Sequence, residues 1–210
     1  MKHILSFLIL LSVVFSACGQ RVYDSTEVNV FRETRDKQFR DPNLSPLRRD
    51  DFASFEGLKY FPIDGKYSVI VTFTENVGEK SFSMPTSSGS SAKYLKIGIL
   101  SFTLDGQECT LGAYRRESAN PNIKPEVDSL FVPFKDLTTG KETYGAGRYV
   151  YVQMPKGNQA FLDFNLAYNP SCAYGDESFS CPIPPKENIL PIEIRAGEKK
   201  FYSTSAKEEK

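Results

Sequence analysis

Acidic, amide and tyrosine side chains gather in three stretches of the second half of the chain, and these residue types are the best suited to chemistry. The candidates are Asp136, Thr139, Glu142, Tyr144, Arg148, Asp163, Asn165, Tyr168, Asn169, Glu187 and Asn188. If the three stretches converge, carboxylates and amides would bond hydroxyl groups, and tyrosine rings would cover apolar ring faces. We therefore interpret the set as a candidate site for a neutral polar ligand such as a sugar.

The same residue types also have purely structural roles. Asp and Asn in turns usually bond the nearby backbone, and an Arg–Glu pair usually braces a loop. Strand alternation from Ala160 to Leu166 would place Asp163 and Asn165 side by side on a face that is exposed to water. A calcium ion would use oxygens of Asp136, Asp163 and Asn165, but the sequence contains no EF-hand or Asp-repeat loop. We expect no metal and no cofactor.

The position of the single histidine restricts the classes of enzyme to which the chain could belong. His3 is the only histidine, and it lies in a segment that we expect to be removed. This excludes Ser-His-Asp and Cys-His catalysis and His-ligated metals in the mature chain. A hydrolase would need two of Asp136, Glu142, Asp163 and Glu187, placed roughly 5–10 Å apart across a cleft. The alternatives to a binding domain are this glycosidase-like hydrolase and a purely structural envelope protein without an ordered pocket.

The amino-terminal segment predicts export and lipid anchoring. Met1-Lys2-His3 precedes an apolar run from Ile4 to Phe15, which is too short to cross a bilayer and is typical of a secretory signal peptide. The words Phe15-Ser16-Ala17-Cys18 resemble the lipobox of bacterial lipoproteins, which implies cleavage before Cys18 and acylation of its thiol. Two or more acyl chains form a stable anchor. The alternative is a secreted protein cut after Ala17, with a free thiol.

The expected location is the outer membrane, facing the periplasm. Gly19 supplies no acidic retention signal, and no acidic run follows Cys18. The 26 basic and 26 acidic residues balance, which argues against nucleic acid as a partner. We expect the partners to be the membrane, through the lipid anchor, and a polar small molecule or an envelope component.

One folded domain is expected between two short flanking segments. The expected divisions are a signal peptide at 1–17, a lipid-anchored spacer at 18–25, a single β-rich domain at 26–205 and a disordered tail at 206–210.

The elements that must position the candidate residues are mostly strands. A helix is predicted over Glu27–Arg40, and a second short helix is predicted after Pro46. Asp105-Gly106 is a strong two-residue hairpin signal. The predicted strands cover 67–74, 94–104, 107–114, 127–134, 148–154, 160–166, 191–195 and 199–203. This pattern predicts a mainly β fold, a single antiparallel sandwich or barrel-like domain of about eight strands with one or two N-terminal helices.

Three cysteines follow Cys18. Cys172 and Cys181 bracket a short polar loop, and in an oxidising compartment we favour a disulfide between them over two buried thiols. Closing a loop of this size stabilises a protein by roughly 2.7 kcal/mol in the chain-entropy model. Cys109 is most simply a packed core thiol, although it remains a possible partner for either of the others.

Several long sequence motifs resemble those of one known family. They include Phe55-Glu-Gly-Leu-Lys-Tyr-Phe-Pro62, Phe131-Val-Pro-Phe-Lys-Asp136, Thr139-Gly-Lys-Glu-Thr-Tyr-Gly-Ala-Gly-Arg-Tyr149, Asp163-Phe-Asn-Leu-Ala-Tyr-Asn-Pro-Ser-Cys-Ala-Tyr174 and Cys181-Pro-Ile-Pro-Pro-Lys-Glu-Asn-Ile-Leu190. On these words the chain resembles the domain of unknown function 1684 family. The resemblance implies a shared architecture from the first helix to Glu198. It supplies no substrate and no catalytic residues.

Overall fold

The computed structural model describes residues 23–76, 78, 80–117, 128–176, 178–203 of the chain. The expected signal peptide, the lipidation candidate Cys18 and the expected tail at 206–210 lie outside the described residues, so they remain predictions.

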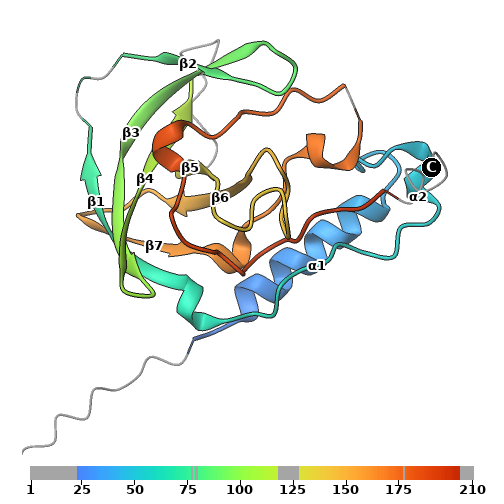
Figure 1. Ribbon diagram of the computed structural model, residues 1–210, viewed down its shortest axis with the longest axis horizontal. Helices are drawn as coiled ribbons and strands as arrows, with labels where there is room; N and C mark the ends of the chain where they lie inside the picture. Colours follow the sequence, from blue (N-terminus) through green and yellow to red (C-terminus); the bar gives the residue numbers. More distant parts are fainter. Residues whose placement is uncertain (1–22, 77, 79, 118–127, 177, 204–210) are drawn as a thin grey trace, which may run out of the picture.

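Seven antiparallel strands form one curved sheet that closes almost completely into a barrel (Figure 1). The strands are β1 (Ser68–Glu75), β2 (Phe82–Pro85), β3 (Ser91–Leu104), β4 (Gln107–Arg116), β5 (Ser129–Phe134), β6 (Arg148–Gln153) and β7 (Gln159–Asp163). They follow the order β6-β5-β4-β3-β1-β7, and β2 pairs with β3. The mainly β prediction is therefore confirmed, and of the two architectures expected from the sequence the molecule adopts the barrel.

The hairpin predicted at Asp105-Gly106 joins β3 to β4. Both residues have positive φ, 49° and 77°, which is the geometry that favours Asp-Gly in tight hairpins. The pairing of Leu104 with Gln107 fixes the register, so the alternating apolar side chains of both strands point into the barrel. The barrel core includes the fully buried residues Val71, Leu100, Leu111, Val132, Val150 and Leu162.

Two helices precede the barrel in the chain. Helix α1 (Thr26–Arg40) lies beside the barrel, and the last segment of the chain runs along it (Figure 1). Its buried residues are Val28 and Phe39. The second helix, α2, is a single turn (Arg49–Phe52). Among the described helices, none combines the length and the apolar character that a membrane crossing requires.

The strand predicted from Ala160 to Leu166 ends earlier. It stops at Asp163, and Phe164–Leu166 forms the 3-10 helix η2. The Asp163 carboxylate accepts the backbone N–H of Asn165 at 2.8 Å, which favours a turn over an extended strand. The prediction that alternation places Asp163 and Asn165 on one strand face is therefore wrong, and Asn165 is buried.

The prediction of a closing hairpin at 191–195 and 199–203 is also wrong. This segment has no strand, because its backbone bonds other parts of the molecule instead of itself. Its backbone partners are Leu137, Phe61, Ala167, Lys59 and Glu142. The segment therefore connects the loop before β1, the loop between β5 and β6 and the chain that follows β7.

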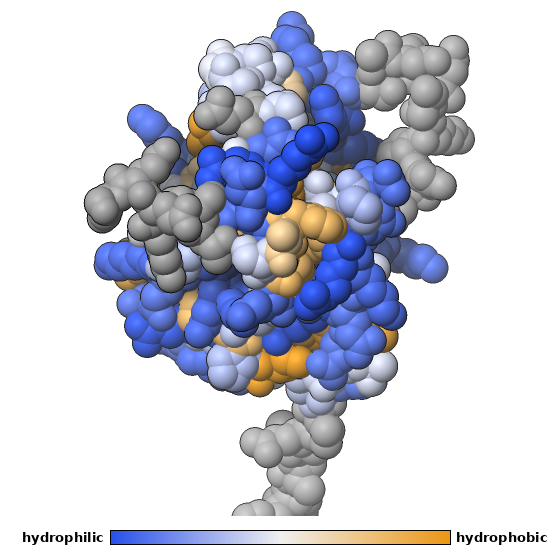
Figure 2. Space-filling view, turned by 90° about the vertical axis from the view of Figure 1, so that its right-hand side faces the viewer, coloured by the Kyte–Doolittle hydropathy of each residue, from blue (hydrophilic) through white to orange (hydrophobic). Residues whose placement is uncertain are grey.

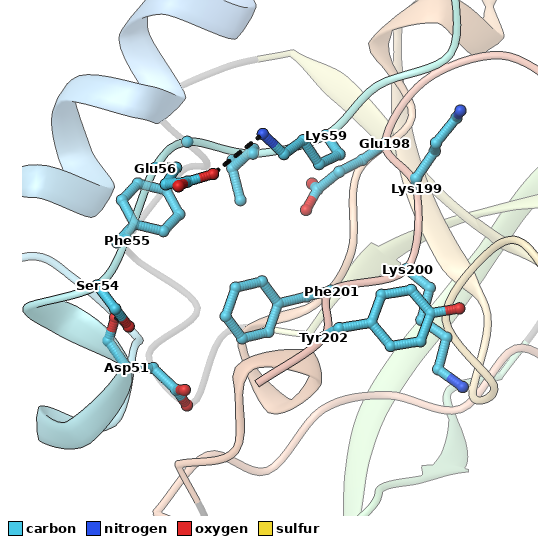
Figure 3. Close-up of a pocket in the computed structure, with 12 residues that line it drawn as sticks. Asp51, Ser54, Phe55, Glu56, Lys59, Glu198, Lys199, Lys200, Phe201 and Tyr202 are labelled. Carbon is cyan, nitrogen blue, oxygen red and sulfur yellow. Dashed lines mark hydrogen bonds and ion pairs between the residues drawn. The ribbon is translucent and has the colours of Figure 1, made fainter. Parts of the chain in front are cut away.

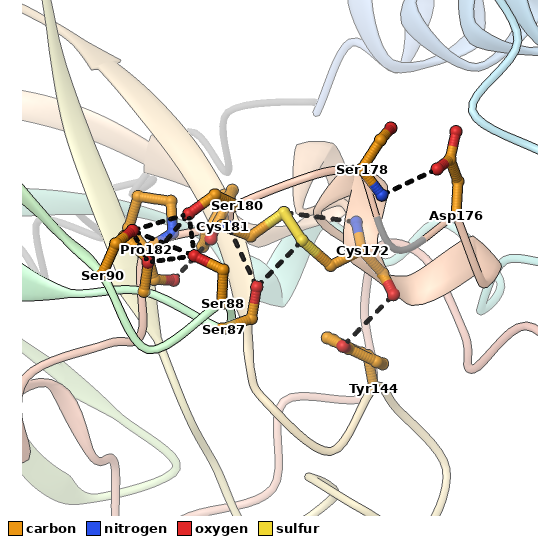
Figure 4. The surroundings of a disulfide bond; sticks show 12 residues. Ser87, Ser88, Ser90, Tyr144, Cys172, Asp176, Ser178, Ser180, Cys181 and Pro182 are labelled. Carbon is orange, nitrogen blue, oxygen red and sulfur yellow. Dashed lines mark hydrogen bonds between the residues drawn. A yellow bond between two sulfur atoms is a disulfide. The ribbon is translucent and has the colours of Figure 1, made fainter.

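The predicted disulfide between Cys172 and Cys181 is present (Figure 4). It connects the 3-10 helix η3 (Ser171–Tyr174) to the chain that pairs with the end of β2, where Ser87 donates its backbone N–H to the Cys181 carbonyl at 2.9 Å. Cys109 is a buried free thiol in the barrel core, as the sequence predicted.

Candidate functional site

The candidate residues do not share one cleft. They belong to separate hydrogen-bond networks, most of which hold the backbone in place.

Asp136 and Arg148 form an ion pair in the interior, with 2.9 Å between Oδ2 and Nη2. Arg148 also donates to the carbonyl oxygens of Ile194, at 2.8 Å, and of Ala196 and Glu198. Burial lowers the pKa of Arg148, while Asp136 opposes the shift. The pair anchors the last segment of the chain to the barrel.

Thr139, the next candidate, supports the same loop. Its hydroxyl accepts the backbone N–H of Asp136 at 3.0 Å. The loop is thereby held in a turn of the kind that Asp and Thr favour.

Asp163 and Asn165 connect β7 to the start of the described chain. Tyr23 donates its hydroxyl to Asp163 at 2.5 Å. Asn165 exchanges two hydrogen bonds with the backbone of Asp64, at 3.1 and 2.9 Å. Burial raises the pKa of Tyr23 strongly, and the Asp163 carboxylate adds to the shift. Both candidates therefore serve as braces between segments.

Glu187 and Asn188 lie in the 3-10 helix η4 (Lys186–Asn188), which contacts β4. Asn188 is buried and donates to the carbonyl oxygens of Gly112, at 2.9 Å, and Pro133, at 2.6 Å, while it accepts the N–H of Gly112 at 2.7 Å. Glu187 pairs with Lys96 at 2.7 Å. Burial raises the pKa of Glu187, but hydrogen bonds from Lys96 and from the Tyr114 hydroxyl outweigh it, and the net shift is downward.

Glu142 and Tyr144 lie in the loop before β6. Glu142 forms an exposed ion pair with Arg195 at 3.0 Å, and Tyr144 donates to the Cys172 carbonyl at 3.4 Å. An exposed ion pair such as that of Glu142 and Arg195 contributes little to stability.

Tyr168 and Asn169 lie beside a second buried ion pair, Arg35 with Glu198. Asn169 donates to both Glu198 carboxylate oxygens, through Nδ2 at 3.0 Å and through its backbone N–H at 3.1 Å. Arg35 of α1 pairs with Glu198 at 3.2 Å and lies over the Tyr168 ring at 4.7 Å. Burial raises the pKa of Glu198, although Arg35 and hydrogen bonds from Tyr174 and Asn169 oppose it.

The carboxylates proposed for a hydrolase are occupied elsewhere. Asp136 is fully buried beside Arg148, while Asp163, Glu142 and Glu187 bond Tyr23, Arg195 and Lys96 respectively. Within the described residues, His, Cys, Asp and Glu side chains form no group of three that would suit a metal ion.

One hollow in the described structure lies away from most of these residues. It is a pocket of about 430 Å3 between the chain that follows α2 and residues 198–202 (Figure 3). The rings of Phe55, Phe201 and Tyr202 and the side chain of Leu58 form much of its wall. Its volume lies in the range of small-molecule sites, about 300–1,000 Å3.

The packing of two aromatic rings fixes the walls of this pocket. Phe55 stacks on Phe39 of α1, with 5.7 Å between ring centroids, and Phe201 packs edge-on against Tyr174 at 5.4 Å. The guanidinium of Arg40 holds the Phe55 carbonyl at 3.4 Å. The rings are therefore oriented by neighbours outside the pocket.

Hydrogen bonds join the two walls at both ends. At one end the backbone N–H of Lys199 donates to the Lys59 carbonyl at 2.8 Å. At the other end the Ser203 hydroxyl contacts both Asp51 carboxylate oxygens at 2.8 Å. Hydrogen bonds within the protein therefore hold the two walls together, and the pocket needs no ligand to form.

Three lysines line the pocket, and the ammonium groups of two of them, Lys199 and Lys200, point away from it (Figure 3). Lys199 lies over the Phe61 ring at 4.9 Å and Lys200 over the Tyr202 ring at 5.4 Å, and no ion pair with a carboxylate is seen for either among the described residues. Lys59 pairs with Glu56 at 3.9 Å across the rim (Figure 3). The face on which α2 lies is mostly hydrophilic, with small separate apolar patches (Figure 2).

Comparisons with known proteins agree on the fold and leave the chemistry open. A family model described as Protein of unknown function (DUF1684) matches residues 53–199. The chain is similar to the solution NMR structure of an uncharacterized protein from Haloarcula marismortui, at 38% identity and a TM-score of 0.66, over 83% of this chain and 93% of that chain. No curated protein matches the sequence. The case for a function therefore depends on the geometry of the sites.

Proposed function

This chain belongs to the DUF1684 family, and from its geometry we propose that it is a lipid-anchored, extracytoplasmic binding domain for a polar, sugar-like ligand. The observation that carries the proposal is the preformed 430 Å3 pocket between the chain after α2 and residues 198–202.

The chemistry of the pocket wall fits a ligand with both an apolar face and hydroxyl groups. Three aromatic rings, Phe55, Phe201 and Tyr202, offer flat apolar surfaces on which a sugar ring packs. The ammonium group of Lys59 lies at the rim beside the Glu56 carboxylate and can donate hydrogen bonds to hydroxyl or carboxylate oxygens. The pocket therefore combines an apolar floor with polar groups around it, which is the usual composition of ligand sites.

This geometry supports binding better than the two alternatives. A hydrolase without histidine needs two reachable carboxylates, and the two carboxylates deepest in this pocket already have partners, Glu198 with Arg35 and Asp51 with Ser203. A purely structural envelope protein is expected to lack an ordered pocket, and the hollow of about 430 Å3 does not fit that expectation.

The position of the pocket supports an outward-facing site on an anchored protein. Helix α1 begins at Thr26, eight positions after the expected anchor at Cys18 in the sequence, and ends beside the pocket, where Arg40 donates to the Phe55 carbonyl. A 15-residue helix is about 22 Å long. The helix would therefore separate the pocket from the membrane surface and leave it open to soluble ligands.

Titration of the full-length protein with neutral and acidic envelope oligosaccharides, followed by calorimetry or NMR, tests the proposal. We expect saturable binding that Tyr202→Ala weakens at least tenfold, which corresponds to about 1.4 kcal/mol. Tyr202 is 66% exposed, so this substitution leaves the core intact.

Tyr151→Ala is the matched control, because Tyr151 is 52% exposed on β6 and does not line the pocket. Equal binding by both variants, or the absence of binding to every oligosaccharide, would contradict the proposal.

A further inference from the structure

The outer face of the barrel carries an exposed apolar pair on β1 and β7. Ile70 and Phe161 are 58% and 56% exposed, and they lie directly opposite each other in the antiparallel pairing of these two strands. The Cβ atoms of such a pair are about 4.5–5.5 Å apart. The two side chains therefore form one continuous apolar surface, in contrast to the single exposed apolar residues that are common on folded proteins.

The same face of the sheet holds the start of the described chain. Asp163 lies two residues after Phe161 on β7, so their side chains are on one face, and Asp163 accepts the Tyr23 hydroxyl at 2.5 Å. The absence of a side chain at Gly65 makes room for Tyr23, because a Cβ there would be 2.7 Å from the Tyr23 Cβ. Two residues of a strand extend about 7 Å, so the apolar pair is adjacent to the place where Tyr23 is bound.

The expected anchor is close to Tyr23 along the chain. Tyr23 is the fifth residue after Cys18, and five residues span at most about 18 Å even when they are fully extended. An acyl chain on Cys18 would therefore keep Ile70 and Phe161 near the bilayer. A short tether also raises the effective concentration of lipid at the apolar pair, so that a small apolar surface is sufficient for a stable contact.

We propose that the outer face of β1 and β7 rests on the lipid bilayer, with Ile70 and Phe161 at the boundary between headgroups and acyl chains. The inference rests on the lipid anchor of the proposed function. Large apolar side chains such as Phe are those that proteins bury at this boundary. In Figure 1, β1 and β7 lie on the left of the barrel, whereas α2, which contributes Asp51 to the pocket, lies on the right. The contact therefore leaves the pocket open to the solution.

A fluorescent label on Ile70→Cys tests the contact. The acylated full-length protein is reconstituted in phosphatidylcholine vesicles that contain a nitroxide lipid, which quenches labels close to the bilayer. The native cysteines do not compete for the label, because one is acylated, two form the disulfide and Cys109 is buried.

Ile189→Cys is the matched control, because Ile189 is also an exposed isoleucine, at 52%. It follows η4, which contacts β4, and β4 and β5 lie across the barrel from β1 and β7 in the strand order. We expect the nitroxide lipid to quench the label at position 70 roughly threefold more than the label at position 189.

Two further changes separate the apolar pair from the tether. Phe161→Ser removes half of the apolar surface and should reduce quenching at position 70 roughly twofold; the fold should persist because Phe161 is exposed. Insertion of about 20 flexible Gly and Ser residues after Gln20 should also reduce it, because the effective concentration falls as the linker lengthens. Quenching that neither change reduces would overturn the proposal.

The outcomes distinguish this contact from the rest of the proposed function. Equal quenching at positions 70 and 189, in a protein whose acylation is confirmed by mass spectrometry, would overturn the bilayer contact alone. A protein without the acyl group would overturn the anchor and the bilayer contact together. Stronger quenching at position 70 in a protein that binds no oligosaccharide would support the bilayer contact and overturn only the sugar-like site.

Discussion

Arg148 and Asp136 form an ion pair in which both side chains are almost completely shielded from water, with exposures of 1% and 0%. Arg148 is the first residue of β6, and its guanidinium also holds the carbonyl of Ile194 at 2.8 Å. One side chain therefore connects the edge of the sheet to the last segment of the chain. This arrangement identifies both residues as structural, whereas the sequence had suggested a ligand site.

Removing one partner of this pair should be costly. Asp136→Ala leaves the Arg148 charge buried without compensation, and we expect the free energy of unfolding to fall by about 3–5 kcal/mol. Urea denaturation followed by circular dichroism measures the change. Glu142→Ala, which removes the exposed partner of Arg195, should cost less than about 1 kcal/mol. Similar losses in the two variants would contradict this assignment.

Asn188 should stabilise the fold, because its side chain forms hydrogen bonds with both β4 and β5. Asn188→Ala leaves the N–H and carbonyl of Gly112 and the carbonyl of Pro133 without their side-chain partner. Because each unsatisfied buried group costs about 1–3 kcal/mol, we expect a loss of roughly 3 kcal/mol in the same denaturation experiment. Asn29→Ala on the exposed face of α1 is the control and should have little effect.

The disulfide should stabilise the fold to a measurable degree. Replacing both Cys172 and Cys181 by serine opens a loop whose ends are 9 residues apart. The chain-entropy model predicts a loss of about 2.7 kcal/mol. Denaturation of the wild type with and without a reducing agent should give the same difference, and the reducing agent should leave the double variant unchanged.

Alkaline pH should unfold the protein through its buried tyrosines. Burial raises the pKa of Tyr23, Tyr60, Tyr149, Tyr168 and Tyr174 above the ordinary value. The folded state thus keeps protons that the unfolded chain releases near pH 10. Stability is full below that pH and falls as the pH rises further, by up to about 1.4 kcal/mol per pH unit for each tyrosine.

Absorbance at 295 nm, which reports tyrosinate, measures this effect alongside circular dichroism. We expect most of the tyrosinate signal to appear together with the loss of structure above pH 10. A signal that rises fully while the fold persists would show that these rings ionise in the native state.

The prediction that the protein is anchored to a membrane depends on Cys18. Cys18→Ser should abolish incorporation of labelled palmitate and move the protein from the membrane fraction to the soluble fraction, because acylation of that thiol is the proposed anchor. Cys109→Ser, at the buried thiol, should leave the fractionation unchanged. A wild-type protein that is already soluble and unlabelled would contradict the prediction.

Local signals in the sequence predicted the main elements of the fold. The hairpin at Asp105-Gly106, the helix that ends at Arg40 and the disulfide all depend on residues close together in the chain. The path of residues 191–203 could not be predicted in this way. Its alternating pattern resembles a hairpin, but its hydrogen-bond partners lie in distant segments, such as Lys59 and Ala167.

The site was harder to predict than the fold for a related reason. Polar residues such as Asp136 and Asn188 suggest a ligand because their types suit chemistry, yet the fold uses their hydrogen bonds internally. The aromatic and apolar wall of the 430 Å3 pocket comes from Phe55, Leu58, Phe201 and Tyr202, whose residue types do not distinguish them from ordinary core residues. Only the placement of two aromatic segments opposite each other, with about 140 residues between them, reveals the hollow.

The contact of Arg35 with Glu198 joins residues separated by 163 positions. The amino-terminal helix therefore cannot reach its final partner until nearly all of the barrel sequence has been synthesised. Contacts this remote in sequence close slowly. In the export that we propose, this delay would be an advantage, because a polypeptide that crosses a membrane pore would not have to break this contact first.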